Sequence, residues 1–269
     1  MVIQTPTQSK WDALLSNLHR PLRVSDFGDI TTPEGRDKAK IEYHKFLCER
    51  KGLLKGPMLV SGLPRAGKTT WAVFHAKFLR DNFGIPCTFD FHPKGDEPFG
   101  PYEYFDETDL QAEVKKVTIM AKKSGSWDER LQMVDEGEVL DFAKRLKIYG
   151  HTLVLDEGTR WLSNKRVMSN VSLILFSILK QWAHYDMLFC LVNHFKQELN
   201  RDVLRYMDHQ GVLVNCSWGC QWKDTGLYNI SNNSLPGREG KMEMTLYGPN
   251  VWKYFNSFSP IAMPGRISL

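Results

Sequence analysis

The sequence lacks long apolar runs and has no strong excess of either charge. Its longest apolar stretch covers only residues 171–179, whereas a helix needs about 20 apolar residues to cross a bilayer. Residues 1–15 also lack the apolar core of a signal peptide. The net charge of +4 permits a nucleic-acid partner without requiring one. We therefore expect a cytoplasmic protein, in the host cytoplasm if it is viral, with no membrane insertion.

Cysteines are few and follow no metal-binding pattern. The five are Cys48, Cys87, Cys190, Cys216 and Cys220. Two of them, Cys87 and Cys190, fall in apolar runs typical of buried strands, which favours a reducing compartment. Three residues lie between Cys216 and Cys220, but no second Cys or His pair has matching spacing. We interpret that segment as a strand and turn, not as a metal site.

No internal repeat and no low-complexity tract is present. Apolar runs predict buried strands at 56–62, 85–91, 151–158 and 187–194. Helical spacing predicts helices at 34–51, 68–82, 109–123, 138–148, 171–184 and 197–208. Strands that alternate with helices predict a parallel sheet with helices on both faces. Between these elements, residues 92–109 are expected to form a long loop, and residues 159–170 a polar, basic connection.

The segment SGLPRAGKTTW has the spacing of a phosphate-binding loop. Four residues separate Gly62 from Gly67, and Lys68 and Thr69 follow. The motif leaves an apolar run and opens a helix, where backbone N–H groups and the helix N-terminus favour phosphate. Lys68 can reach the β- and γ-phosphates of ATP, and the Thr69 hydroxyl can ligate Mg²⁺. The predicted nucleotide-binding residues are Gly62, Leu63, Pro64, Arg65, Ala66, Gly67, Lys68, Thr69 and Thr70.

The third predicted strand, HTLVLDEG, ends in two carboxylates. Asp156 is expected beside the Mg²⁺ held by Thr69, so these two residues are the predicted metal ligands. Glu157 follows and is the predicted general base that polarises the attacking water. A whole strand with its helices lies between Lys68 and Asp156. This order resembles the division of P-loop proteins in which a catalytic Glu activates water, and it differs from the kinase and GTPase division.

Three further residues complete the predicted site. Asn193 ends the fourth strand, where that division places a polar sensor of the γ-phosphate; ordinary turn chemistry is the alternative. Arg201 and Arg205 are four apart on one face of a predicted helix. Either could stabilise transition-state charge at the site of a neighbouring subunit, or both could belong to a solvated basic face. The predicted catalytic residues are Glu157, Lys68, Asn193, Arg201 and Arg205.

These features predict a P-loop NTPase fold, a three-layer α/β/α sandwich around a mostly parallel sheet. Residues 1–50 are expected to form an N-terminal arm and helix, and residues 51–210 the P-loop ATPase core. Beyond the core, residues 211–218, 227–231 and 241–247 have the pattern of strands joined by Gly, Asn and Ser turns. Residues 211–269 are therefore expected to be a β-rich C-terminal extension of the same domain.

The segments LVLDEGTRWLSNKR, LKQWAHYDMLFCLVNH and ELNRDVLRYMD together resemble the FtsK/HerA group of DNA-pumping ATPases. That group includes viral DNA-packaging motors and, more distantly, zonula-occludens-toxin-like proteins of filamentous phages. The resemblance covers roughly residues 56–210. It departs from the group at Asn193, where Gln is frequent, and in the N-terminal region, which matches no domain of the group.

The resemblance implies a homo-oligomeric ring, with a hexamer favoured, that binds ATP and Mg²⁺ at subunit junctions and double-stranded DNA in its channel. A compact chain without a transmembrane segment fits a viral genome packager, whose partners would include capsid or portal-like proteins. DNA contact should come from Lys or Arg on pore loops. Lys165 and Arg166 are the candidates, with Arg160 a candidate for phosphate sensing or DNA; a solvated connection is the alternative.

Several other functions remain open at this stage. The chain could be another P-loop ATPase, such as a zonula-occludens-toxin-like phage assembly protein. It could be a nucleotide kinase, although no Arg-bearing lid follows the phosphate loop. A protein-remodelling ATPase should end in a helical lid, which the strand-rich tail does not provide. A nucleotide-regulated binding module with little turnover is the alternative outside enzymes.

Overall fold

The computed structural model describes residues 24–50, 57–94, 98–125, 141, 143–163, 170–183, 186–218, 225–232 and 242–247. The chain divides into two compact units, Met1–Lys55 and Gly56–Leu269. Within the described residues, we find no helix that combines the length and the apolar character needed to cross a membrane. The second unit contains all the predicted site residues considered below, which include Lys68, Thr69, Asp156, Glu157 and Asn193.

The first unit contains a short 3-10 helix, η1 (Val24–Phe27), and helix α2 (Pro33–Arg50). The start of α2 is specified locally, because the Thr32 hydroxyl accepts the N–H of Gly35 at 3.1 Å and Pro33 needs no partner in the first turn. The Phe27 ring lies 5.1 Å from Tyr43 and 5.3 Å from Phe46. The helix predicted over residues 34–51 is therefore present.

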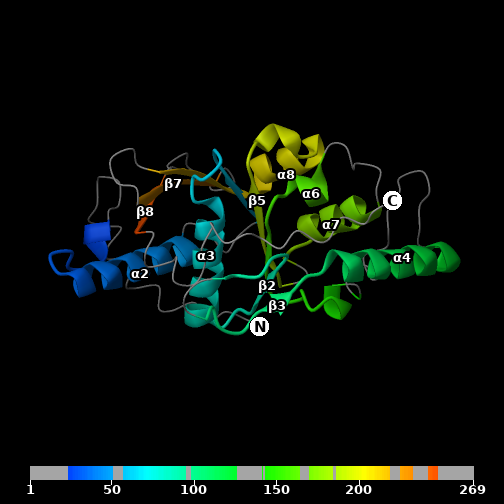
Figure 1. Cartoon of the computed structure of the whole chain (residues 1–269), viewed down its shortest axis with the longest axis horizontal. Coiled ribbons are helices and arrows are strands. Elements are labelled where there is room, and N and C mark those ends of the chain that lie inside the picture. The colour runs from blue at the N-terminus through cyan, green and yellow to red at the C-terminus, as the bar shows by residue number, and fades with distance from the viewer. Residues whose placement is uncertain are drawn as a thin grey trace. The chain divides into compact units, whose positions relative to one another are not determined.

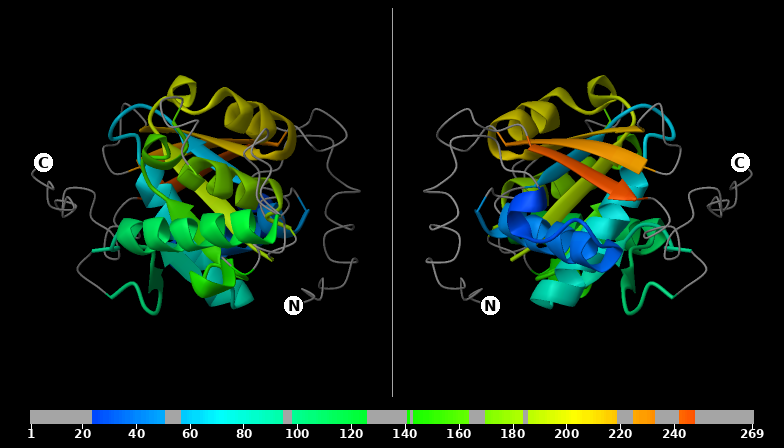
Figure 2. Two further views of the ribbon diagram at one scale, coloured as in Figure 1. Left: turned by 90° about the vertical axis from the view of Figure 1, so that its right-hand side faces the viewer. Right: turned by 90° about the vertical axis from the view of Figure 1, so that its left-hand side faces the viewer.

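The second unit is built on one eight-stranded sheet in the order β3-β2-β4-β5-β1-β6-β7-β8. The first six strands in that order are mutually parallel, and β7 and β8 complete the sheet as antiparallel strands. Figure 2 shows β7 and β8 side by side. The strands are β1 (Met58–Ser61), β2 (Cys87–Phe89), β3 (Glu103–Tyr104), β4 (Thr152–Leu155), β5 (Leu188–Asn193), β6 (Val212–Trp218), β7 (Thr225–Asn232) and β8 (Met242–Tyr247). The predicted α/β fold with a mostly parallel sheet is confirmed.

Helices cover both faces of this sheet, which is why its central strands are apolar on both sides. The helices are α3 (Lys68–Phe83), α4 (Glu107–Ser124), α6 (Thr159–Leu162), α7 (Asn170–Lys180) and α8 (Arg201–Gln210), with a 3-10 turn η3 (Lys196–Glu198) before α8. Leu153 and Leu155 of β4 belong to the core packed on α4 and α7. Figure 1 shows α3 on the other side of the strands. The result is a three-layer sandwich.

The inserted strand β5 decides which residues share the edge of the sheet. It pairs in parallel with β1, placing Asn193 opposite Ser61, and with β4, placing Leu191 opposite Leu155. Because β1, β4 and β5 are parallel, their carboxyl ends lie at one edge. Strand β6, which we assigned from sequence to the C-terminal extension, pairs in parallel with β1 on its other side.

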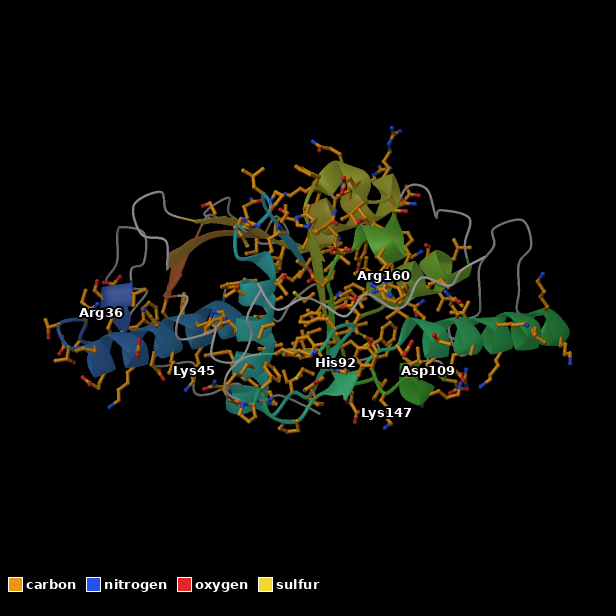
Figure 3. All side chains as sticks on the ribbon, viewed as in Figure 1. Arg36, Lys45, His92, Asp109, Lys147 and Arg160 are labelled. Carbon is orange, nitrogen blue, oxygen red and sulfur yellow. The ribbon has the colours of Figure 1, made fainter. Side chains whose placement is uncertain are left out.

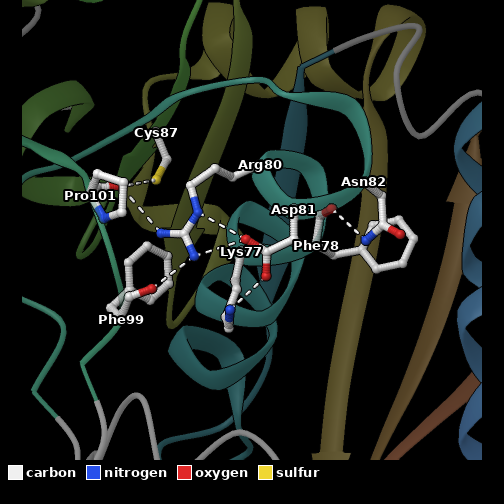
Figure 4. A network of polar contacts seen from close by, with 8 residues as sticks. All are labelled: Lys77, Phe78, Arg80, Asp81, Asn82, Cys87, Phe99 and Pro101. Carbon is white, nitrogen blue, oxygen red and sulfur yellow. Dashed lines mark hydrogen bonds and ion pairs between the residues drawn. The ribbon is translucent and has the colours of Figure 1, made fainter.

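The segment expected to be a long loop at 92–109 contains more structure than its Pro, Gly and acidic residues indicated. Strand β3 and the start of α4 lie within it, and the Asp106 side chain caps α4 by accepting the Thr108 N–H at 2.7 Å. Arg80, near the end of α3, donates to the Phe99 carbonyl at 2.8 Å and to the Pro101 carbonyl at 3.2 Å (Figure 4). These bonds hold the described part of the loop at the end of α3 opposite the phosphate loop.

The predicted polar connection at 159–170 is also partly wrong. Its first four residues form α6, in which Trp161 and Leu162 are each 1% exposed. The tryptophan ring lies 5.7 Å from Phe105, and its carbonyl accepts the Ser172 hydroxyl at 2.8 Å. A short helix with two buried apolar residues in a polar segment gives no periodic signal, so the sequence did not reveal it. Lys165 and Arg166, the DNA-contact candidates, lie outside the described residues.

Candidate nucleotide site

The phosphate loop connects β1 to α3 through backbone that only certain residues tolerate. Gly62 has φ 152° and Gly67 has φ 83°. A Cβ at Gly62 would lie 2.5 Å from the carbonyl oxygen of Cys216 on β6, which is too close. Arg65, with φ 61°, is left-handed without being glycine, a conformation that costs about 1 kcal/mol or more. The loop thus keeps a strained, specific shape of the kind that directs N–H groups at an anion.

Neighbouring strands fix where the loop begins. The hydroxyl of Ser61, the last residue of β1, donates to the Asn215 side-chain oxygen on β6 at 2.9 Å. On the other side of β1, Asn193 of β5 stands opposite Ser61 in the register. Residues 62–69 therefore leave the sheet between Asn193 of β5 and Asn215 of β6. This is the edge of the sheet at which Asp156 and Glu157 follow β4.

Lys68 is buried, at 5% exposure, and its ammonium group donates to the Leu63 carbonyl at 2.8 Å. The same carbonyl accepts the Ala66 N–H at 3.1 Å, so the Leu63 carbonyl binds both the backbone of the loop and the Lys68 side chain. Burial lowers the pKa of Lys68, while the charge of Asp156 acts in the opposite direction. A buried cation with one carbonyl partner is placed to bind phosphate oxygens, because charge-assisted hydrogen bonds are stronger than neutral ones.

The predicted metal ligands lie together. The Thr69 hydroxyl donates to the Asp156 carboxylate at 3.2 Å, across 87 residues of sequence. Burial raises the pKa of Asp156 to about 6, and its hydrogen bonds from the Glu157 N–H and Thr69 counteract this. A hydroxyl and a carboxylate are the oxygen ligands that Mg²⁺ prefers. The donor set therefore fits Mg²⁺.

Glu157 lies on a tight turn after β4. Its backbone has φ 51°, and its side chain is exposed. The N–H of Gly158 donates to the Val192 carbonyl at 2.7 Å, which ties the turn to β5. A Cβ at Gly158 would approach the Leu191 side chain to 2.7 Å. The turn is thus packed closely on β5 and leaves the Glu157 carboxylate accessible to solvent at the carboxyl edge.

Asn193 is buried, at 1% exposure, and both ends of its amide bind backbone. Its oxygen accepts the Thr159 N–H at 3.4 Å, and its nitrogen donates to the Phe195 carbonyl at 2.6 Å. The side chain therefore joins the end of β5 to the turn that carries Glu157. A sensor role would require the amide to exchange one of these partners for phosphate.

Arg201 and Arg205 are both exposed on α8. Asn200 caps this helix by accepting the Asp202 N–H at 2.7 Å, and its own N–H donates to the Leu162 carbonyl at 2.8 Å. Arg205 also lines a surface hollow of about 530 Å³ with Phe176, Asp202, Tyr206, His209 and Gln210. Helix α8 is thus linked through α6 to the turn of Glu157, while its arginines face outward.

Two residues at this edge carried no assignment in the sequence analysis. Asp90 follows β2, and burial raises its pKa to about 7. His194 follows Asn193; burial lowers its pKa, the Lys68 ammonium lowers it further, and Glu157 opposes that effect. The His194 Nδ1 is buried without a hydrogen-bond partner. The expectation that polar residues gather where parallel strands end would have found both.

Arg160, the third candidate for phosphate or DNA contact, lies next to the turn that carries Glu157. Its guanidinium carbon is 5.1 Å from the centre of the Trp161 ring (Figure 3). This is cation–π distance, and the side chain is partly buried. In the described structure, this side chain stacks on Trp161, and its charge also acts on the Asp90 carboxylate.

The phosphate loop connects the buried strand β1 to helix α3. Strand β4, which is followed by two acidic residues, is separated from β1 by the one inserted strand β5. This arrangement defines the P-loop NTPase fold. No protein-family model matches the sequence, and no curated protein is significantly similar to it. Among solved structures, the N-terminal domain of zonular occludens toxin from Neisseria meningitidis matches 75% of this chain and 98% of its own, with 9% identity and a TM-score of 0.45.

Two other solved structures are similar at a comparable level. The genome packaging NTPase B204 from Sulfolobus turreted icosahedral virus 2, in complex with ATP-gammaS, covers 71% of this chain and 97% of its own, with 8% identity and a TM-score of 0.41. A DnaB-like replicative helicase covers 72% of this chain and 55% of its own, with 14% identity and a TM-score of 0.36. Because these scores are low, the fold assignment depends on the strand order and the phosphate loop.

Proposed function

We propose that this chain is a Mg²⁺-dependent ATPase of the FtsK/HerA type that moves double-stranded DNA as a ring oligomer, a hexamer being favoured, and that its biological task is viral genome packaging. The observation that supports hydrolysis most strongly is the contact of Thr69 with Asp156. It places the phosphate loop and the acidic strand end at one site, with Glu157 on the adjoining turn. Recognition of DNA rests on the sequence resemblance described above.

Each group in the site has a chemical task in this reaction. Lys68 binds the β- and γ-phosphate oxygens and neutralises their charge. Thr69 and Asp156 would hold Mg²⁺, which when bound would stabilise the negative charge that develops on the leaving ADP. Glu157 accepts a hydrogen bond from a water molecule, orients it toward the γ-phosphorus and takes its proton. Asn193 and an arginine, either Arg201 or Arg205 of a neighbouring copy, contact the γ-phosphate.

The first test is turnover by the purified chain. We expect hydrolysis of ATP that requires Mg²⁺ and increases on addition of double-stranded DNA. Glu157→Gln should lower kcat at least about 100-fold, the usual contribution of a general base, while ATP binding is kept. Glu103→Gln is the matched control, because the Glu103 side chain on β3 is 47% exposed and its carboxylate lies 3.6 Å from the Lys147 ammonium group.

The same assay separates the rival functions. A nucleotide kinase would transfer phosphate to a small acceptor, and its turnover would rise with that acceptor instead of with DNA. A nucleotide-regulated binding module would bind ATP with normal affinity and show no turnover. A zonula-occludens-toxin-like assembly protein would hydrolyse ATP without stimulation by double-stranded DNA. Any of these results would contradict the motor proposal.

A further inference from the structure

The buried carboxylate of Asp90 holds both ends of the turn that carries Glu157. One of its oxygens accepts the backbone N–H of Asp156 at 2.8 Å, and the other accepts the indole N–H of Trp161 at 2.7 Å. Asp90 itself is 7% exposed. The two oxygens of this one side chain thus connect residue 156 to residue 161, at the two ends of the same turn.

The sheet explains why a side chain is needed there. Strands β2 and β4 pair up to Phe89 and Val154, and the Asp90 N–H continues the ladder to the Val154 carbonyl at 3.3 Å. Strand β4 ends at Leu155, so the next N–H, that of Asp156, no longer faces a β2 carbonyl. The Asp90 carboxylate takes its place, and a buried N–H is not left without a partner.

The turn held in this way is strained. Glu157 has φ 51° without being glycine, and such residues persist only where their surroundings hold them. From the β5 side, the Gly158 N–H is bound by the Val192 carbonyl. From the β2 side, Asp90 holds the residue before Glu157 and the indole four residues after it. The backbone of Glu157 is therefore fixed between its two neighbouring strands.

The indole is itself fixed, so it can serve as an anchor. Trp161 is 1% exposed, its ring contacts Phe105 at 5.7 Å, and its carbonyl accepts the Ser172 hydroxyl. Moving Trp161 would therefore disturb the packing of α7 and of the segment before α4. The bond from Trp161 to Asp90 transmits this rigidity to the Leu155–Asp156 peptide, whose N–H the Asp90 carboxylate accepts.

We propose that Asp90 is a positioning residue that sets the direction of the Glu157 carboxylate by bridging the Asp156 N–H and the Trp161 indole. The assignment rests on the proposed ATPase function. In this proposal, Asp90 affects the reaction only by holding the turn that carries Glu157, and it does not contact the nucleotide. It is therefore needed for a correct attack geometry and is dispensable for nucleotide affinity.

An amide cannot replace this carboxylate, and that gives a specific test. Asp90→Asn has one acceptor oxygen and one NH₂ group, so the NH₂ must face one of the two N–H donors. Trp161→Phe removes the indole donor and the conflict with it. Asparagine can then accept the Asp156 N–H without opposition, so the double variant Asp90→Asn/Trp161→Phe should behave like Trp161→Phe alone.

The experiment measures kcat, KM and ATP-gammaS affinity for the full chain and these three variants. Asp90→Asn should lower kcat at least about tenfold, the cost of about 1.4 kcal/mol of lost transition-state stabilisation, and leave KM and affinity within about twofold. Thr88→Val is the matched control. It removes a buried hydroxyl on the same strand, bound to His151 at 2.8 Å, and should lower stability without changing kcat.

Three results would overturn the inference. Asp90→Asn could be as active as the wild type, its loss could lie in affinity, or Thr88→Val could lose kcat in the same proportion to its lost stability. A double variant with a kcat clearly below that of Trp161→Phe alone would also contradict the bridging geometry. An inactive wild-type chain would refute the proposed function and this inference together, whereas an active wild type with an equally active Asp90→Asn refutes this inference alone.

Discussion

The Thr69 hydroxyl lies 3.2 Å from the Asp156 carboxylate, although 87 residues separate them in the chain. Thr69 opens α3 and Asp156 follows β4, and β5 separates β4 from the strand that precedes α3. The contact therefore depends on the insertion of β5 into the parallel sheet. It brings the two predicted Mg²⁺ ligands within reach of one cation.

Lys68→Ala should weaken nucleotide binding strongly and leave the protein folded. The buried ammonium would no longer bind phosphate, and the loss of a charge-assisted bond of about 3 kcal/mol weakens affinity about 100-fold. Binding of ATP-gammaS by calorimetry measures this. Lys116→Ala is the control, since Lys116 is a surface lysine with a 64% exposed side chain, and equal losses in both variants would contradict the assigned role of Lys68.

Two glycine substitutions separate steric conflict from backbone strain. Both Gly62 and Gly84 have positive φ, but a Cβ at Gly62 would lie 2.5 Å from the Cys216 carbonyl oxygen, whereas nothing lies within 4 Å of one at Gly84. Gly84→Ala should cost about 1 kcal/mol of stability and keep nucleotide affinity. Gly62→Ala should displace the loop and lose affinity. Thermal unfolding and ATP-gammaS titration measure the two effects, and unchanged affinity in Gly62→Ala would be inconsistent with this geometry.

His75 should make the protein less stable in acid. Burial lowers its pKa from 6.5 to about 3, so between these values the unfolded chain binds a proton that the folded chain does not. Stability is therefore unaffected by His75 above pH 6.5 and falls by about 1.4 kcal/mol per pH unit below about pH 6. Denaturant unfolding from pH 7 to pH 4.5 should show this slope.

His75→Gln isolates the effect, because glutamine does not titrate. The slope of unfolding free energy against pH should differ between wild type and variant by about 1.4 kcal/mol per pH unit, which corresponds to one proton. The comparison removes the opposite contributions of Asp90 and Asp156, whose raised pKa values make stability increase as the pH falls from 7 toward 4. His209→Gln is the control at an exposed histidine. Parallel pH profiles for wild type and His75→Gln would exclude the role of His75.

An arginine of α8 should act on the site of another subunit. Arg201→Ala or Arg205→Ala should abolish hydrolysis but keep ATP binding, because neither side chain is needed to form the phosphate loop. Mixing either inactive variant with Lys68→Ala should restore part of the activity at mixed junctions. Arg145→Ala, which removes one of the two cationic partners of Glu113, should stay active. A fully active monomer would refute action between subunits.

The sequence revealed the parts of the site whose signals are local. Spacing identifies Gly62 to Thr69, and an apolar run that ends in two acids identifies Asp156 and Glu157. The order of these motifs indicated that a strand lies between them along the chain, and β2 occupies that place. The insertion of β5 between β1 and β4 in the sheet came from the structure, which confirms the predicted mostly parallel sheet. The roles assigned to the residues of these motifs, and to Asn193, Arg201 and Arg205, all stay predictions.

The residues that the sequence did not reveal act through distant partners. Asp90 lies near the end of the apolar run 85–91, and only the β2–β4 register shows that it faces the Asp156 N–H. Trp161 sits in a segment rich in polar residues, and its burial depends on Phe105 and Ser172. Short strands such as β3 escape periodicity because two residues contain no period.

Electron cryomicroscopy of the full chain with double-stranded DNA, Mg²⁺ and a non-hydrolysable ATP analogue tests the central claim most directly. The account predicts rings with DNA in the channel, the phosphates on residues 62–69, a cation between Thr69 and Asp156, and the Glu157 carboxylate facing the γ-phosphate. Phosphates bound elsewhere, or a Glu157 carboxylate directed away from the γ-phosphate in the bound state, would contradict it.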